Sequence, residues 1–77
     1  GFTIQVYSGT KREDALNAKK DLASFVPELE SDVQYTQPNF RVKVGRYFKR
    51  IDAQKDYLIV KQYFPTAIVI PDKVSIN

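Results

Sequence analysis

The feature that most constrains the fold of this chain is an internal duplication. When the 77-residue sequence is displaced by 38 positions, seven residues in a 26-residue stretch fall on identical residues. Ordinary amino-acid composition would give about one or two such identities by chance. The matched pairs are Phe2/Phe40, Val6/Val44, Lys11/Lys49, Arg12/Arg50, Asp14/Asp52, Ala15/Ala53 and Pro27/Pro65. The chain is therefore predicted to consist of two copies of one supersecondary unit.

Each copy has the pattern of two strands that flank a helix. Residues 2–6 and 40–44 alternate apolar and polar side chains, which is the period of a half-buried strand. Residues 32–36 and 67–70 are short candidates for the closing strands. The predicted order within each copy is therefore strand, helix, strand.

Apolar residues at helical spacing predict the two helices. The stripes are Ala15, Ala18, Leu22 and Phe25 in the first copy and Ala53, Tyr57, Val60 and Phe64 in the second. Thr10 followed by Glu13 predicts a capping box at the start of the first helix. Each helix is predicted to stop before a proline, Pro27 or Pro65, because the residue before a proline is pushed out of the helical region.

Two such units predict an α+β fold. Right-handed crossovers place both helices on one face of a four-stranded sheet, which is the ferredoxin-like or RNP-like βαββαβ arrangement, with the first and third strands at its centre. A chain of 77 residues has room for one domain, so residues 1–77 are predicted to form it. There is no initiating methionine and no signal-like apolar segment, as expected of a module excised from a longer protein.

Strand alternation then predicts the two faces of the sheet. The predicted core residues are Phe2, Ile4, Val6, Phe40, Val42 and Val44. The outward residues are Thr3, Gln5, Tyr7, Arg41 and Lys43, which would form a polar, basic platform that carries one aromatic ring. This platform is the first candidate for a functional surface.

Charge and composition narrow the chemistry. Residues 1–38 carry a net charge of −2 and residues 39–77 a net charge of +5, so the two copies have diverged in charge. The basic run at residues 41–50 favours either an anionic partner or a solvated edge. The chain has no cysteine and no histidine, which removes thiolate chemistry, the usual zinc sites and the commonest general base. With no phosphate-binding glycine loop either, we expect no enzyme, no cofactor and no metal.

The amino-acid sequence around both strand-to-helix junctions resembles that of the SPOR domain, the sporulation-related repeat of bacterial cell-envelope proteins. The residues that carry the resemblance are 4–9 with Arg12 and Ala15, and 40–47 with Arg50 and Ala53. The resemblance covers nearly the whole chain and implies a non-enzymatic module that binds peptidoglycan. It implies a preference for glycan strands from which amidases have removed the stem peptides, as found at division septa. The expected location is the periplasm or cell envelope of a bacterium.

The resemblance also implies a site on the open face of the sheet. The strand-one glutamine of the family corresponds to Gln5, the serine after it to Ser8, and the third-strand arginine to Arg41, with Lys43 nearby. Many members have tryptophan two positions before that arginine, where this chain has Asn39. The expected glycan-binding residues are therefore Gln5, Tyr7, Ser8, Asn39, Arg41 and Lys43.

A second departure concerns the aromatic rings. The family often has glycine at the position of Tyr7 and an aromatic residue at that of Gly9. Sugar stacking would therefore fall to Tyr7 or to Tyr35, and Tyr35 fits a core position equally well because it shares a strand face with Val33.

Two alternative functions remain open for the same face, a single-stranded RNA-binding module and a protein-interaction module. The aromatic signature of RNA-recognition strands is absent and Tyr7 alone would stack a base, so no nucleic acid is expected. The expected partners are peptidoglycan glycan strands, together with other envelope or division proteins. Contact with a membrane is expected only through segments of the parent protein outside this chain.

Overall fold

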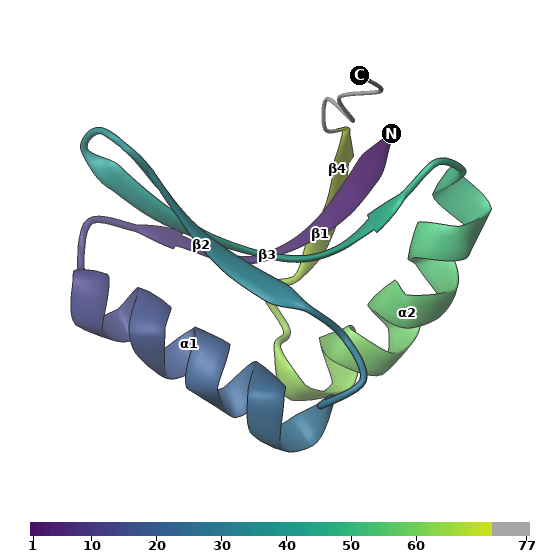
Figure 1. The fold of residues 1–77 in the computed structure, drawn as a ribbon, viewed down its shortest axis with the longest axis horizontal. Coiled ribbons are helices and arrows are strands. Elements are labelled where there is room, and N and C mark those ends of the chain that lie inside the picture. Colours follow the sequence, from purple (N-terminus) through teal and green to yellow (C-terminus); the bar gives the residue numbers. More distant parts are fainter. Residues whose placement is uncertain (72–77) are drawn as a thin grey trace.

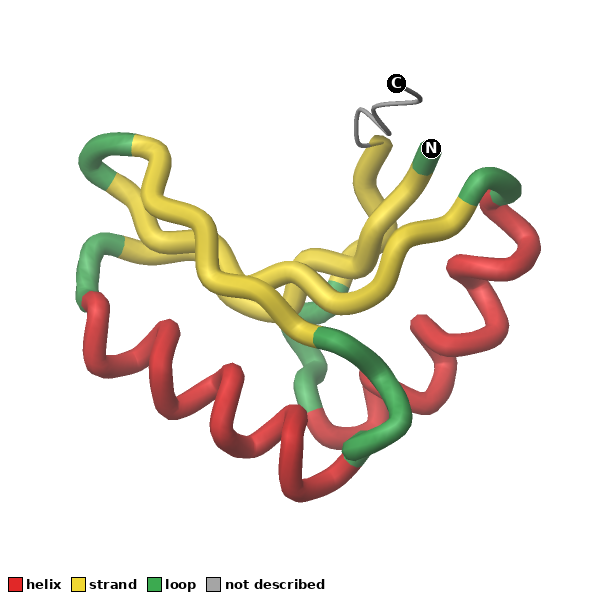
Figure 2. Tube along the Cα trace, in the orientation of Figure 1, coloured by secondary structure: helices red, strands yellow, loops and turns green. Residues whose placement is uncertain are grey.

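The structure, a computed structural model, describes residues 1–71, so residues 72–77 of the predicted domain lie outside the described residues. Its elements are β1 (Phe2–Gly9), α1 (Arg12–Phe25), β2 (Ser31–Thr36), β3 (Asn39–Tyr47), α2 (Arg50–Tyr63) and β4 (Ile68–Pro71). The strands form one antiparallel sheet in the order β2-β3-β1-β4, and both helices cover the same face (Figure 1). Figure 2 shows the two layers, with the yellow sheet above the red helices and its other face open. The predicted α+β class and βαββαβ order are confirmed.

The duplication extends to the backbone hydrogen bonds. The bounds of α2 are those of α1 displaced by 38 residues. The N–H groups of Ala15 and Ala53 donate to the carbonyls of Lys11 and Lys49, in both cases at 3.3 Å. The turn after each helix is closed by equivalent bonds, from Leu29 N–H to the Val26 carbonyl at 3.0 Å and from Ala67 N–H to the Phe64 carbonyl at 2.9 Å. The two copies therefore fold by the same local rules.

The predicted capping box at the first helix is wrong. Lys11 occupies the N-cap position of α1 and makes no side-chain capping bond, and Lys49 does the same at α2. Glu13 and Asp14 lie in the first turn of α1, where their negative charge interacts favourably with the helix dipole. The start of α1 is thus stabilised by charge rather than by a cap at Thr10.

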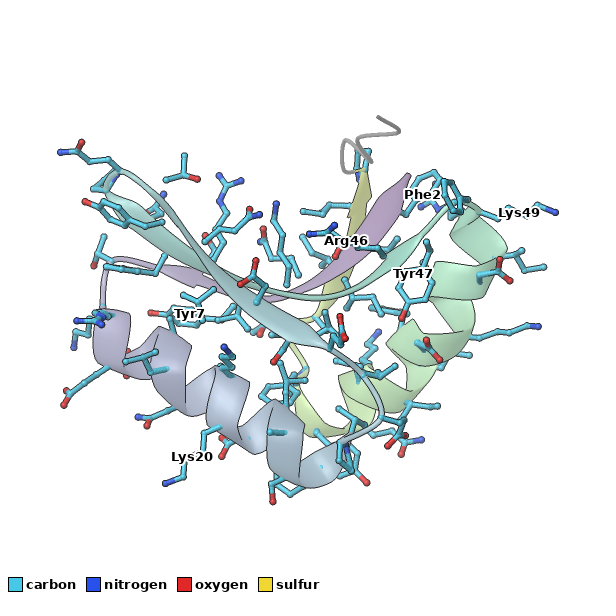
Figure 3. All side chains as sticks on the ribbon, in the orientation of Figure 1. Phe2, Tyr7, Lys20, Arg46, Tyr47 and Lys49 are labelled. Atoms are coloured by element: carbon cyan, nitrogen blue, oxygen red, sulfur yellow. The ribbon has the colours of Figure 1, made fainter. Side chains whose placement is uncertain are left out.

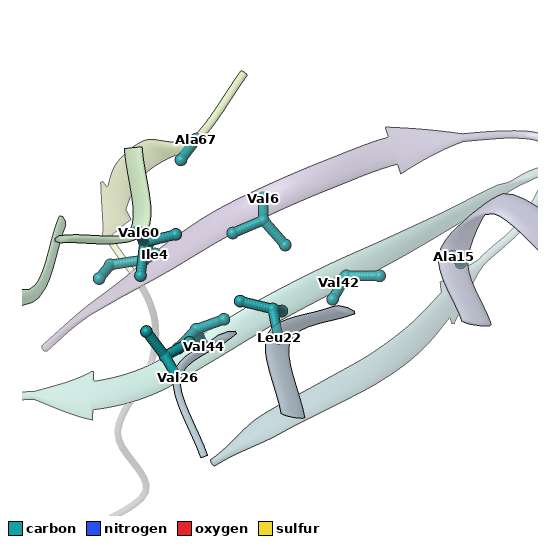
Figure 4. Close-up of a cluster of buried hydrophobic side chains, with 9 residues drawn as sticks. All are labelled: Ile4, Val6, Ala15, Leu22, Val26, Val42, Val44, Val60 and Ala67. Atoms are coloured by element: carbon teal, nitrogen blue, oxygen red, sulfur yellow. The ribbon is translucent and has the colours of Figure 1, made fainter. Parts of the chain in front are cut away.

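The core lies between the sheet and the helices. Its buried side chains are Ile4, Val6, Ala15, Leu22, Val26, Val42, Val44, Val60 and Ala67 (Figure 4). Phe2 is half-buried, and Phe25, predicted on the buried stripe of α1, is 50% exposed. The Phe25 ring instead stacks on that of Tyr63, with 4.7 Å between centroids, where the C-terminal ends of the two helices meet. No helix within residues 1–71 is long and apolar enough to cross a membrane.

A β-bulge in β1 overturns the prediction that Tyr7 faces outward. The register between β1 and β3 shifts between Gln5 and Tyr7, so that Val6 is an extra residue and Tyr7 pairs with the buried Val42. Because a bulge re-aims the side chains that follow it, Tyr7 turns toward the helices. It is half-buried against the core, and its hydroxyl donates to the Lys11 carbonyl at 3.4 Å (Figure 3).

A second bulge, in β3, turns Tyr47 toward the helices in the same way. The register shifts between the pairs Phe2/Tyr47 and Ile4/Val44, and Gly45 at this point has a φ of +68°, which favours glycine. Tyr47 turns toward α2, where its hydroxyl donates to Asp56 Oδ2 at 2.6 Å. Burial, then the hydrogen bond to Asp56 and the charge of Asp56, raise the pKa of Tyr47 well above its ordinary value.

Candidate functional site

The open face of the sheet is built from cross-strand rows. Ser8 of β1 is the register partner of Arg41 of β3, and Gln5 is that of Lys43. Directly opposed residues of antiparallel strands share a face, so each row presents one uncharged hydrogen-bonding side chain and one cation. The structure therefore brings four of the predicted site residues together in two neighbouring rows.

Both rows continue into β2. Gln34 is opposite Arg41, and Asp32 is opposite Lys43. Asn39 lies at the hairpin end of β3, one row beyond Arg41, and so it is on the same face at its periphery. The sequence analysis did not predict Asp32 and Gln34 as residues of this face. Their alternation with Val33 could have placed them there.

The open face is hollowed by a cleft of about 560 Å³. It is lined by Thr3, Glu30, Ser31, Asp32, Gln34, Lys43, Gly45 and Arg46. Every lining residue is polar or glycine, and two acids oppose two bases, so a ligand here would be held by hydrogen bonds and charge rather than by apolar contact. Of the predicted site residues, only Lys43 lines this cleft.

Arg46 is the most prominent residue that the sequence analysis missed. It follows Gly45 at the bulge and lines the cleft, and Figure 3 shows it on the open side of the sheet. Simple alternation from the buried Val44 would have turned Arg46 inward. The duplication could have identified Arg46, because a displacement of 38 residues aligns it with Ser8, which is a predicted site residue.

A smaller cleft of about 320 Å³ lies beside the edge of β1 that faces away from β3. Its lining residues are Gln5, Val6, Tyr7, Ser8 and Thr66. The strand β4 pairs with residues 2–5 of β1, so within residues 1–71 the second half of β1 has no strand neighbour on that side. The Thr66 hydroxyl donates to the Val6 carbonyl there at 2.9 Å. Gln5 and Ser8 therefore border both the open face and this edge.

Arg41 holds an unsatisfied donor. Its Nε is buried and has no hydrogen-bond acceptor among the described residues. A buried donor without an acceptor costs about 1–3 kcal/mol, and a ligand oxygen would remove this cost only if the Arg41 side chain moved to expose its Nε.

The open face lacks the aromatic ring that was predicted there. Tyr7 faces the helices, and Tyr35 pairs with Phe40, with 4.6 Å between ring centroids, on that same side of the sheet. Strand alternation places no ring of residues 1–71 on the open face. Its apolar positions are instead Ile70 and Ile68 of β4, opposite Thr3 and Gln5. Stacking on a tyrosine is therefore not available at this surface.

The fold and this surface define a small α+β binding domain with one open, polar sheet face. The family model of the SPOR domain matches residues 1–71, and the chain belongs to the SPOR domain family. SPOR domains are binding domains, so the expectation of a non-enzymatic module is confirmed.

Two solved structures share the fold. The peptidoglycan-binding domain of the B. subtilis cell wall lytic enzyme CwlC, a solution structure, is 15% identical with a TM-score of 0.76, over 94% of this chain and 89% of that one. The crystal structure of the RlpA SPOR domain from Pseudomonas aeruginosa is 12% identical with a TM-score of 0.68, over 94% of this chain and 100% of that one. A search of curated protein sequences finds no significant match.

Proposed function

We propose that this domain binds peptidoglycan through the open face of its sheet and recognises glycan strands from which the stem peptides have been removed. Membership of the SPOR family supports the proposal, as does the fold shared with a peptidoglycan-binding domain. The observation that carries it is the pairing of an uncharged hydrogen-bonding residue with a cation in each of two rows, Gln5 with Lys43 and Ser8 with Arg41. A repeated arrangement of this kind suits a repeating polymer.

The chemistry of the bare glycan matches these rows. Removal of the stem peptide leaves a free lactyl carboxylate on each muramic acid, which Arg41, Lys43 and Arg46 would bind by charge-assisted hydrogen bonds. Gln5 and Ser8 would bond to hydroxyl or acetamido groups. Exposed ion pairs contribute only about 0.2–1 kcal/mol each, so selectivity requires several sugars to be engaged at once.

The consequence for the parent protein would be targeting. A domain that binds stripped glycan would hold its parent at the septum or at other sites of wall remodelling in the bacterial envelope. The absence of aromatic rings from the open face among residues 1–71 weighs against the RNA-binding alternative, because single-stranded nucleic acid is held largely by stacking.

The proposal is tested by co-sedimentation with intact sacculi, amidase-treated sacculi and polyuridylate at two salt concentrations. Amidase treatment is expected to increase pelleting of the domain. Arg41→Gln and Gln5→Ala should each reduce it, with folding checked by circular dichroism. The matched control is Lys20→Gln, which removes an exposed cation from α1 on the other face.

Three results would contradict the proposal. Equal binding to intact and treated sacculi would remove the glycan preference, and full binding by Arg41→Gln and Gln5→Ala would remove the site. Binding to polyuridylate that falls steeply with salt would favour the nucleic-acid alternative.

A further inference from the structure

The side of α2 that faces away from the core carries two exposed aliphatic side chains. Ala53 and Val60 are fully buried and define the side of the helix that packs on the sheet. Ile51 and Leu58 each lie two residues before one of them, about 200° away around the helix. They are 65% and 58% exposed. Two large aliphatic side chains thus follow one line on the outermost surface of the molecule, where polar residues are the rule.

Basic residues accompany this apolar line. Phe48, 73% exposed, precedes the helix, and the four consecutive residues 48–51 are all exposed. Two of these are Lys49 and Arg50, and Figure 3 shows Lys49 projecting away from the body of the domain. The α2 patch is defined here as Phe48, Lys49, Arg50, Ile51, Lys55 and Leu58. It combines three apolar side chains with three cations, and the one acid beside it is the exposed Asp52, so the segment with Asp52 included carries a net charge of +2.

This combination indicates the chemistry of the partner. Apolar side chains flanked by lysine and arginine on one side of a helix suit the interface of a membrane, where the apolar groups enter the headgroup region and the cations meet anionic lipid. Neither of the two clefts described above includes a residue of the α2 patch. A flat anionic surface is the occupant that these properties match.

We propose that the α2 patch docks this domain on the surface of a membrane that contains anionic lipid, in place of the expectation that only segments outside this chain contact a membrane. Because both helices cover one face of the sheet and the candidate site occupies the other, the patch and the open face are on separate layers of the molecule (Figures 1 and 3). Docking through α2 would leave the open face free for its ligand. The inference does not depend on what the open face binds.

The test is flotation of the domain with lipid vesicles. One set of vesicles is phosphatidylcholine alone, and in the other phosphatidylglycerol replaces part of it. The charge variant is Lys49→Gln/Arg50→Gln, and its control is Lys19→Gln/Lys20→Gln, which removes two exposed cations from α1.

The apolar variant in the same test is Ile51→Ser/Leu58→Ser. Its control is Leu16→Ser, at a 45% exposed position of α1. All of these side chains are exposed, so folding should be retained, and circular dichroism and binding to treated sacculi check it independently.

We expect binding to the phosphatidylglycerol vesicles only. Each basic side chain near an anionic surface strengthens binding by about fivefold, so the double charge variant should bind roughly 25-fold more weakly, and added salt should weaken the wild type. The apolar variant should also lose binding, and both α1 controls should keep it.

Equal binding to both vesicle types, or equal losses in the α1 controls, would overturn the proposal. A wild type that ignores vesicles but dimerises in sedimentation velocity, with the dimer lost in Ile51→Ser/Leu58→Ser, would assign the patch to a second copy of the chain instead. Binding to sacculi is scored separately, so failure of this inference and failure of the proposed glycan site are distinguishable.

Discussion

Replacement of Gly45 by alanine tests the bulge that sets the two faces of β3. Gly45 has a φ of +68°, which a residue with a Cβ adopts at a cost of about 1–2 kcal/mol. An added Cβ would also lie 2.7 Å from Tyr47 Cζ, well inside contact distance. The Tyr47 ring must therefore move, although its hydroxyl is bonded to Asp56 at 2.6 Å.

The expected loss of stability is large for a domain of this size. Loss of a hydrogen bond to a charged group costs about 1.5–3 kcal/mol. The alanine also lowers the entropy of the unfolded chain, which offsets about 0.4–1 kcal/mol of the loss. Together with the backbone cost, Gly45→Ala should lower the free energy of unfolding by about 2–4 kcal/mol. A 77-residue domain has only about 4–12 kcal/mol in total.

Gly9→Ala is the matched control. An added Cβ at Gly9 would lie 2.9 Å from Tyr7 Cζ, but Gly9 is not at a positive φ and the Tyr7 hydroxyl bond is long, at 3.4 Å. Tyr7 can therefore move at little cost, and we expect a loss below about 1 kcal/mol. Urea unfolding followed by circular dichroism measures both variants. Equal losses, or a loss below 1 kcal/mol in Gly45→Ala, would refute the reasoning.

Three further predictions follow from the core and the two tyrosines. Leu22→Ala should cost about 2–5 kcal/mol in urea unfolding, because Leu22 is 1% exposed at the centre of the core; a loss under 1 kcal/mol would contradict this packing. Because the pKa of Tyr47 is raised in the folded state, the folded state holds that proton more tightly, and stability should fall as pH rises above about 10. Tyr47→Phe should show a smaller fall over the same range, and an unchanged fall would assign the titration elsewhere. Tyr7→Phe should retain full binding to treated sacculi, because Tyr7 faces the helices; a loss of binding would return it to the site.

Much of the fold could be predicted because the two copies use the same local signals. The helices end where Pro27 and Pro65 follow them, and the buried stripes hold at Ala15, Leu22 and Val60. These signals depend on residues close in sequence, so they can be recognised without the tertiary structure. The central position of β1 and β3 was correct for another reason, because it follows from the right-handed crossovers of two strand-helix-strand units.

The faces of the central strands could be predicted only in part, because alternation fails when one residue is inserted. Gln5, Arg41 and Lys43 precede any break in their alternation and lie on the open face as expected. Tyr7 follows the bulge at Val6, and nothing in the local sequence marks that bulge. It arises from the pairing of β1 with β3, which is a contact between residues far apart in the chain.

The two tyrosines show how the copies diverged without loss of the fold. Displacement by 38 residues places Tyr7 on Gly45 and Gly9 on Tyr47, so each copy has one glycine and one tyrosine in opposite order. In both copies the ring lies over the glycine, within 3 Å of where a Cβ would stand, and faces the helices. The exchange keeps the aromatic ring in the core layer of each copy.

The arrangement of β1 beside β3 then gives the open face its chemistry. The strands are antiparallel neighbours, so each row of the face pairs a residue of the first copy with one of the second. The first copy contributes uncharged hydrogen-bonding side chains, Gln5 and Ser8, and the second contributes cations, Lys43 and Arg41. If the copies had remained identical, a row of two glutamines or two lysines would offer hydrogen bonds without charge, or like charges in repulsion. Divergence in charge between the copies therefore gives each row one uncharged hydrogen-bonding group and one cation.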